Sequence, residues 1–160
     1  MLKNLEMICR DMEFNSQICT TEEQSKRLLA LGLKKETADM MLVRDFRYLL
    51  EEPYRVTIWT PSIISAHNNF QEFVDSMTIT LKGISKQFVN DGYKPAWSLH
   101  RLIEMCNNTQ VGMTIGIYRD EVTVDGDLFE VWDNTYDNLI SIIEWLIKSG
   151  HFNENYLDIH

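Results

Sequence analysis

Reactive side chains are most concentrated in the stretch KPAWSLHRLIEMC, residues 94–106, which contains His100, Glu104 and Cys106. On a helix, a histidine and a glutamate four residues apart share one face, where they could transfer protons or bind a metal ion. Either role needs a further partner, and the sequence offers none at a useful spacing. The pair is therefore better interpreted as a polar contact on a helix surface.

The same stretch carries the signals of a helix start. Ser98 is a favourable N-cap residue, and Pro95 before it keeps the approaching chain extended. Trp97 and Leu102 occupy the two positions of a hydrophobic staple, so the tryptophan is expected to pack over the helix entry. The apolar side chains of this segment recur at helical spacing: Leu99, Leu102, Ile103 and Cys106. Cys106 is thus expected to be a buried, inert thiol.

Other candidate groups also have a structural interpretation. The cysteines, Cys9, Cys19 and Cys106, are odd in number and widely spaced, which favours free thiols in a reducing cytoplasm. Asp125 and Asp127 are arranged like a small cation site, but a hairpin tip explains them better. The sequence has no glycine-rich phosphate loop and no HExxH, GxSxG or CxxC motif. We therefore expect no catalytic, cofactor-binding or metal-binding residues, and keep as an alternative a small enzyme whose groups converge in the fold.

The net charge of -9 is concentrated in the last quarter of the chain. Residues 119–160 hold ten acids against two bases, whereas residues 1–118 are nearly neutral. Such a surface repels phosphate backbones, so direct nucleic-acid binding is not expected, but it is compatible with a basic protein partner. The residues chosen for that partner surface are Asp120, Asp127, Asp133 and Trp145. The simpler alternative is a solvated acidic face that favours solubility.

Two further helices can be placed from their ends. In the first, Thr21 is the N-cap residue, Gln24 completes a capping box and Gly32 ends the helix. The segment KKETADMML, residues 34–42, is expected to form a short second turn or helix. The last helix begins at Asn134 or Thr135 and ends at Gly150. Its apolar stripe consists of Leu139, Ile142, Ile143 and Leu146, and Trp145 lies away from its centre.

Between the helix at residues 99–106 and the last helix, the sequence predicts a β-meander. The pair Asp125-Gly126 is typical of a two-residue type I′ hairpin, which places Val124 opposite Asp127. A turn near residues 119–120 then pairs Ile117 with Val122 and Ile115 with Val124. Both turns give a register in which the same face is apolar on all three strands.

The segment from about residue 43 to residue 93 is the least readable part of the chain. RVTIW, residues 55–59, and MTITL, residues 77–81, alternate like strands. Phe70, Phe73, Val74 and Met77 have helical spacing. The pattern is compatible with a helix flanked by two strands, whose order relative to the meander the sequence does not give.

Three blocks carry a resemblance: TTEEQSKRLLALGLKKETADM at Thr20–Met40, PAWSLHRLIEM at Pro95–Met105, and YDNLISIIEWLIKSGHFNENY at Tyr136–Tyr156. Their order, with a meander before the last block, resembles short proteins of phages, prophages and mobile elements from gut Bacteroides and relatives. The resemblance implies a bacterial cytoplasm and transfers no catalytic residue. The chain departs from the pattern in the long segment between residues 43 and 93.

Together these patterns predict a single α+β domain, residues 1–160, in which capped helices cover one face of a small antiparallel sheet. No apolar run approaches the roughly 20 residues of a membrane span, and the N-terminus does not resemble a signal peptide. The expected function is that of a non-enzymatic accessory protein that binds another protein in the bacterial cytoplasm. One alternative is an acidic decoy that occupies the DNA-binding surface of a host defence or regulatory protein, and the other is the small enzyme.

Overall fold

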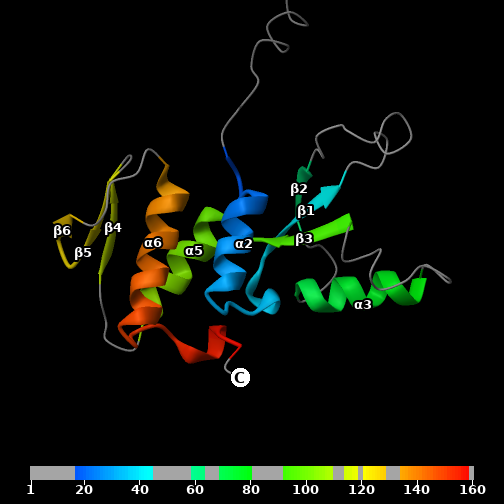
Figure 1. Cartoon of the computed structure of the whole chain (residues 1–160). Helices are drawn as coiled ribbons and strands as arrows, with labels where there is room; N and C mark the ends of the chain where they lie inside the picture. Colours follow the sequence, from blue (N-terminus) through cyan, green and yellow to red (C-terminus); the bar gives the residue numbers. More distant parts are fainter. Residues whose placement is uncertain are drawn as a thin grey trace, which may run out of the picture.

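The structure, a computed structural model, describes residues 17–44, 59–63, 69–80, 92–109, 114–118, 121–128 and 134–158. In these parts the chain forms an α+β fold, as predicted, but it has two antiparallel sheets where the sequence predicted one (Figure 1). No helix in these residues is long and apolar enough to cross a membrane.

Helix α2, Glu22–Ala30, has the ends that the sequence predicts. Gln24 donates its backbone N–H to Thr21 Oγ1, and its side-chain oxygen accepts from the N–H of Thr21, which completes the capping box. At the other end Gly32 adopts a φ of +94°, and its N–H donates to the carbonyl of Leu29. Glycine adopts this left-handed conformation without steric cost, which explains why the helix ends there.

The segment after α2 differs in part from the prediction. Residues Lys35–Thr37 form the short 3₁₀ helix η1, but Met40–Arg44 form strand β1 instead of continuing a helix. Met41 and Leu42 are buried in this strand. The apolar run is therefore a buried central strand, a pattern that periodicity alone does not separate from a short helix.

Strand β1 is the centre of a sheet that the sequence did not reveal. It pairs antiparallel with β2, Trp59–Ile63, on one side and with β3, Tyr93–Ala96, on the other. Pro61 and Pro95 lie in the two outer strands, paired with Leu42 and Met41 respectively. Proline cannot donate a ladder hydrogen bond, so its presence is consistent with edge strands.

Helix α3, Phe70–Thr80, corrects the prediction for the segment MTITL. Its residues Met77–Thr80 are helical and not a flanking strand. The helical spacing noted from the sequence is confirmed, because Phe70, Phe73 and Val74 are buried on one face. The ring of Phe73 meets that of Tyr93 edge-on at 5.0 Å, which packs α3 against β3. The predicted strand at residues 55–59 lies, except for Trp59, outside the described residues.

Helix α5, Leu99–Asn107, begins at the predicted cap, with Ser98 Oγ accepting from the N–H of Arg101. Trp97, Leu102 and Cys106 are completely buried in one hydrophobic cluster, as the staple and the apolar stripe require. Residues 94–106 thus form the end of an extended strand followed by a capped helix.

The meander has the predicted register. Strand β4, Ile115–Tyr118, pairs with β5, Glu121–Val124, and β5 pairs with β6, Asp127–Leu128. Ile117 lies opposite Val122, and Val124 lies opposite both Ile115 and Asp127. Asp125 and Gly126 both have positive φ, at 52° and 89°, as a type I′ turn needs.

Helix α6, Thr135–Lys148, is capped by Asn134, whose side chain accepts from the N–H of Tyr136. Its whole predicted stripe is buried, and Gly150, with a φ of 73°, terminates it. The chain then continues through the short 3₁₀ helix η3, Glu154–Tyr156, back to the end of α2. There Lys34 donates its backbone N–H to the carbonyl of Tyr156, and Asp158 donates to the carbonyl of Gly32.

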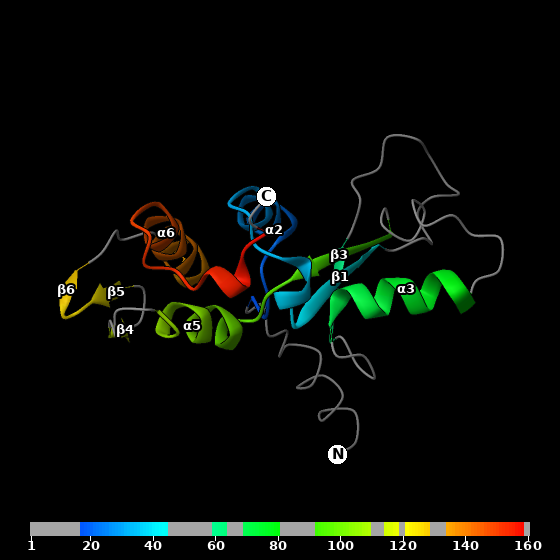
Figure 2. The same cartoon turned by 90° about the horizontal axis from the view of Figure 1, so that it is seen from below.

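The helices α2, α5 and α6 lie together in the middle of the molecule, with the meander at one end and the first sheet with α3 at the other (Figures 1 and 2). The main hydrophobic cluster contains residues of all these helices, of α3, and of strands β1 and β5. Burial of this cluster is the main force that holds the elements together, since apolar burial dominates folding. The sequence blocks 20–40, 95–105 and 136–156 supply most of it.

Candidate functional site

Polar side chains converge at a buried junction around Trp97, between the segments that flank α2 and the start of α5. The indole Nε1–H of Trp97 donates to Thr37 Oγ1 at 2.9 Å. Its backbone N–H donates to Thr20 Oγ1 at 3.0 Å, and its carbonyl accepts from the N–H of Thr20 at 2.9 Å. Trp97 therefore joins the segments before and after α2 to the start of α5, and every polar atom of the residue has a partner.

The carboxylate of Asp39 completes the junction at the N-terminus of α5. It accepts a hydrogen bond from the backbone N–H of Ser98 at 2.8 Å and another from the Ser98 hydroxyl. Negative charge is favourable at this end of a helix. Arg101, one turn further on, donates from Nε to the carbonyl of Thr37 at 2.8 Å. The serine is thus held as a cap by the carboxylate, and its oxygen is directed at the helix backbone rather than at a substrate.

Two titratable groups near this junction, Cys19 and Tyr136, remain protonated at neutral pH. Burial, with a smaller contribution from the charge of Asp39, raises the pKa of the Cys19 thiol to about 11. Burial chiefly, with smaller effects of Cys19 and Asp39 and an opposing hydrogen bond with the Leu99 backbone, raises the pKa of Tyr136 to about 12. A thiol acts as a nucleophile in its ionised form, so these shifts disfavour catalysis by Cys19.

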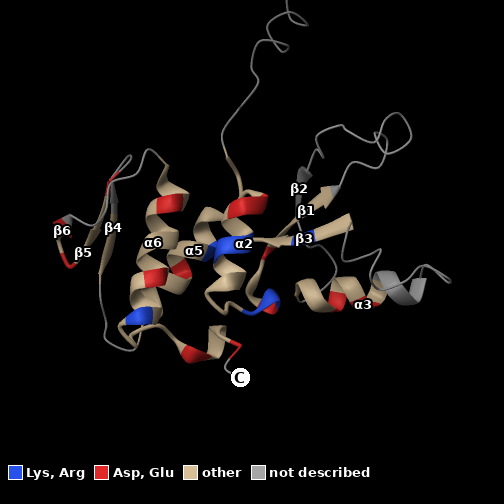
Figure 3. Cartoon of the chain, in the orientation of Figure 1, with Lys and Arg blue, Asp and Glu red and all other residues tan. Residues whose placement is uncertain are grey.

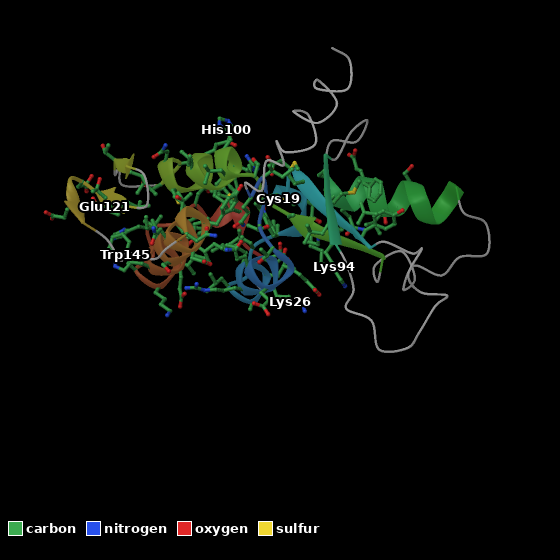
Figure 4. All side chains as sticks on the ribbon, turned by 90° about the horizontal axis from the view of Figure 1, so that it is seen from above. Cys19, Lys26, Lys94, His100, Glu121 and Trp145 are labelled. Atoms are coloured by element: carbon green, nitrogen blue, oxygen red, sulfur yellow. The ribbon has the colours of Figure 1, made fainter. Side chains whose placement is uncertain are left out.

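The described contacts do not join the other reactive side chains of residues 94–106, which are His100, Glu104 and Cys106, to one another. Burial raises the pKa of Cys106 to about 12, and its Sγ lies 4.0 Å from the carbonyl oxygen of Leu139. His100 is exposed on the outer side of α5 (Figure 4). The ion pair that the structure shows for Glu104 is with Arg101 at 2.5 Å, so the predicted His100–Glu104 contact is not the one formed. The described contacts give this stretch a structural role.

In the acidic quarter, residues 119–160, one group of the described acids faces α2 and another is exposed (Figure 3). The first group faces α2. Asp137 Oδ1 accepts from Gln24 Nε2 at 2.9 Å, and Glu144 is 2.6 Å from both Arg27 and Lys148. The hydrogen bond from Arg27, followed by that from Lys148, lowers the pKa of Glu144. These acids join α6 to α2 and are not available as a free acidic surface.

The second group is exposed, on the meander and on the C-terminal segment. Its members are Glu121, Asp127, Glu154 and Asp158. No described residue forms an ion pair with Glu121 or Asp127. Asp125 is also exposed, but its Oδ1 accepts from the N–H of Thr114 at 2.9 Å, so this carboxylate stabilises the turn. Asp120 and Asp133, chosen from the sequence as partner residues, lie outside the described residues.

Trp145 is the aromatic residue chosen from the sequence for the partner surface. Its residue surface is 37% exposed, and the described residues include just one other large hydrophobic residue that is exposed, Ile18. It lies on α6, the helix against which β5 packs. Glu121 and Trp145 are found at the same end of the molecule (Figure 4). Of the four chosen residues, the structure therefore describes Asp127 and Trp145, and both are exposed.

Some contacts of this region could not be found from the sequence. Gln24 meets Asp137 and Arg27 meets Glu144 across more than 110 residues of chain. The sequence indicated that these acids were charged and on helices, but no local signal gave their partners. Within the described ranges, no three His, Cys, Asp or Glu side chains are grouped so that they could hold a metal ion.

Comparisons with known proteins add no assignment. No family model matches the chain, and no match was found among curated proteins or solved structures.

Proposed function

We propose that this protein is a non-enzymatic accessory protein that binds a basic protein partner through the exposed carboxylates of its meander. The observation that carries the proposal is the division of the acidic quarter. Asp137 and Glu144 are engaged by α2, whereas Glu121 and Asp127 are exposed on neighbouring strands without a basic partner among the described residues. Exposed charge of one sign attracts a partner of the other sign and speeds their encounter.

The resemblance of the three sequence blocks to phage, prophage and mobile-element proteins supplies the proposed setting, the cytoplasm of a Bacteroides-like bacterium. In that setting, an accessory protein without its own chemistry acts by occupying a surface of a host or phage protein. The buried junction is consistent with this, because its thiol and phenol have raised pKa values and its serine serves as a helix cap.

The test is affinity capture with matched variants. The full-length chain, immobilised, is incubated with a Bacteroides lysate, and the bound proteins are identified by mass spectrometry. The double variant Glu121→Lys, Asp127→Lys reverses charge on the meander. The control Glu23→Lys, Glu36→Lys makes the same change in net charge at exposed positions on and after α2.

We expect a protein with a basic surface to be captured by the wild type and the control and to be lost from the meander variant. Equal capture by all three chains would contradict the proposal. Addition of duplex DNA then tests the decoy alternative, since DNA displaces the captured partner if this protein occupies a DNA-binding surface. A partner that binds both at once excludes the decoy.

A further inference from the structure

The chain that follows α6 consists of a buried anchor and a surface segment. Gly150 reverses the chain, and Phe152 is then only 2% exposed, inside the main hydrophobic cluster. Residues 153–158 are all half-buried or exposed, and none of them is buried. In Figure 1 this part of the chain passes in red below the helix layer, from α6 toward α2. Core burial therefore fixes the chain as far as Phe152 and no further.

Backbone hydrogen bonds attach residues 153–158 to the chain that follows α2. The N–H of Lys34 donates to the carbonyl of Tyr156 at 2.9 Å. The N–H of Asp158 donates in the other direction, to the carbonyl of Gly32, at 2.8 Å. The segment is thus held beside residues 32–34 in the manner of an added antiparallel strand.

The side chain of Tyr156 attaches the same segment to α5. Its hydroxyl accepts from Asn108 Nδ2 at 2.7 Å, and the guanidinium carbon of Arg101 lies 5.5 Å from the centre of its ring. Contacts of both kinds stabilise only modestly when they lie at the surface. Arg101 has two further partners, the carbonyl of Thr37 and the carboxylate of Glu104, which hold it in place without the ring.

We propose that residues 153–158 form a latch, held by Tyr156, that opens as a local unit while the helices stay folded. A segment with little buried apolar area and with hydrogen bonds at the surface opens at a lower free energy than the core. Opening frees the N–H of Lys34, the carbonyl of Gly32 and the face of Arg101 under the ring. The latch therefore controls access to these groups. This inference is independent of the meander surface in the proposed function.

Hydrogen exchange of the full chain, followed at single amides by nuclear magnetic resonance, tests the latch. The amides of Lys34 and Asp158 are the reporters, because opening breaks their hydrogen bonds. The amide of Leu33 is the matched control. It lies next to a reporter in sequence, but it donates to the carbonyl of Leu28 at 3.2 Å and so belongs to the end of α2.

Tyr156→Ala removes both side-chain contacts of the latch, and Tyr156→Phe removes only the hydroxyl. We expect Tyr156→Ala to speed exchange at Lys34 and Asp158 by about 5-fold or more, the combined effect of one cation–π contact and one hydrogen bond. Exchange at Leu33 should stay unchanged. Tyr156→Phe should have a smaller effect, and Glu154→Gln, at an exposed position of the same segment, should have none.

Two results would overturn the latch. Unchanged exchange at Lys34 and Asp158 in Tyr156→Ala would show that this side chain does not hold the segment. Equal acceleration of the two reporters and of Leu33 would show that residues 153–158 open only together with the helices. Tyr156→Phe, which keeps the ring, supplies the same comparison if Tyr156→Ala fails to fold.

Discussion

The indole of Trp97 is completely buried, and its Nε1–H donates to Thr37, so replacing it removes both packing and a buried hydrogen bond. Trp97→Ala should lower the free energy of unfolding by about 3 to 5 kcal/mol. Trp97→Phe should lower the free energy of unfolding by a smaller amount, because most of the ring packing is kept. Urea denaturation of the two variants measures both effects. If Trp97→Ala kept the denaturation midpoint of the wild type but no longer bound a partner, Trp97 would be a binding residue instead.

The pKa of Cys106 makes a prediction about alkaline pH. Burial raises this pKa from 9.0 to about 12, so the folded chain holds the thiol proton more tightly than the unfolded chain. The contribution of this group to the free energy of unfolding is fully present below about pH 9 and is lost as the pH rises toward 12. Across that window the free energy of unfolding should fall by up to about 1.4 kcal/mol per pH unit for this group.

Denaturation midpoints of the wild type and of Cys106→Ala, measured between pH 8 and the alkaline limit, check this dependence. The variant will be less stable at every pH because of its cavity, but its stability should fall less steeply with pH. Tyr136, whose pKa is also raised to about 12, contributes equally to both curves. Parallel curves for the two proteins would mean that Cys106 is not buried as a protonated thiol.

The same burial predicts that Cys19 and Cys106 are unpaired and free of metal in the native protein. Mass spectrometry without reductant should show no intramolecular disulfide, and elemental analysis should find less than about one zinc per ten chains, against near-full occupancy for a structural site. Alkylation of these two thiols should require unfolding, since both are buried. A stoichiometric metal would contradict the structural interpretation of the cysteines.

At the scale of single elements, the hairpin at Asp125-Gly126 can be tested separately from the core. Gly126 has a φ of 89°, and a Cβ added there meets no atom within 4 Å, so Gly126→Ala adds backbone strain without a clash. We expect a loss of about 1 to 2 kcal/mol in the free energy of unfolding. Asp125→Asn is the matched control, because asparagine tolerates positive φ and keeps an oxygen that can accept from Thr114.

The elements that the sequence predicted well are those specified by neighbouring residues. The capping box of Thr21, the cap of Ser98 and the Asp125-Gly126 turn each need a few consecutive residues, and all are confirmed. The first sheet depends on pairing between segments far apart in the chain, such as Met40 with Ala96. Such a register is set by tertiary packing. Local patterns therefore predicted a turn or helix over residues 34–42, where β1 begins, and a strand over residues 77–81, where α3 ends.

At the scale of the whole molecule, the packing of α6 on α2 explains why the acids of residues 119–160 do not all lie on one exposed surface. The helix layer brings α6 against α2, where Arg27 and Gln24 engage Glu144 and Asp137. The sequence predicted the amount of charge and its position along the chain. It could not separate the acids that hold the helices together from those that face solvent, because the separation depends on partners more than 100 residues away.

This separation decides how electrostatic steering should be tested. If Glu121 and Asp127 attract a basic partner, association should slow markedly as salt rises from roughly 50 to 500 mM, because the Debye length shrinks from about 14 to about 4 Å. Glu121→Lys with Asp127→Lys should slow association further, while stability changes by about 0.5 kcal/mol per exposed site.

Stopped-flow or surface-binding kinetics with the captured partner measure these rates. Asp137 is unsuitable as a probe, because it accepts a hydrogen bond from Gln24 and lies in the first turn of α6, where its charge also stabilises the helix. Glu144 is unsuitable for a similar reason, since its replacement would leave Arg27 without its ion pair. If the association rate ignores both salt and the two meander reversals, the partner is not steered by this surface. The exposed carboxylates would then serve solubility.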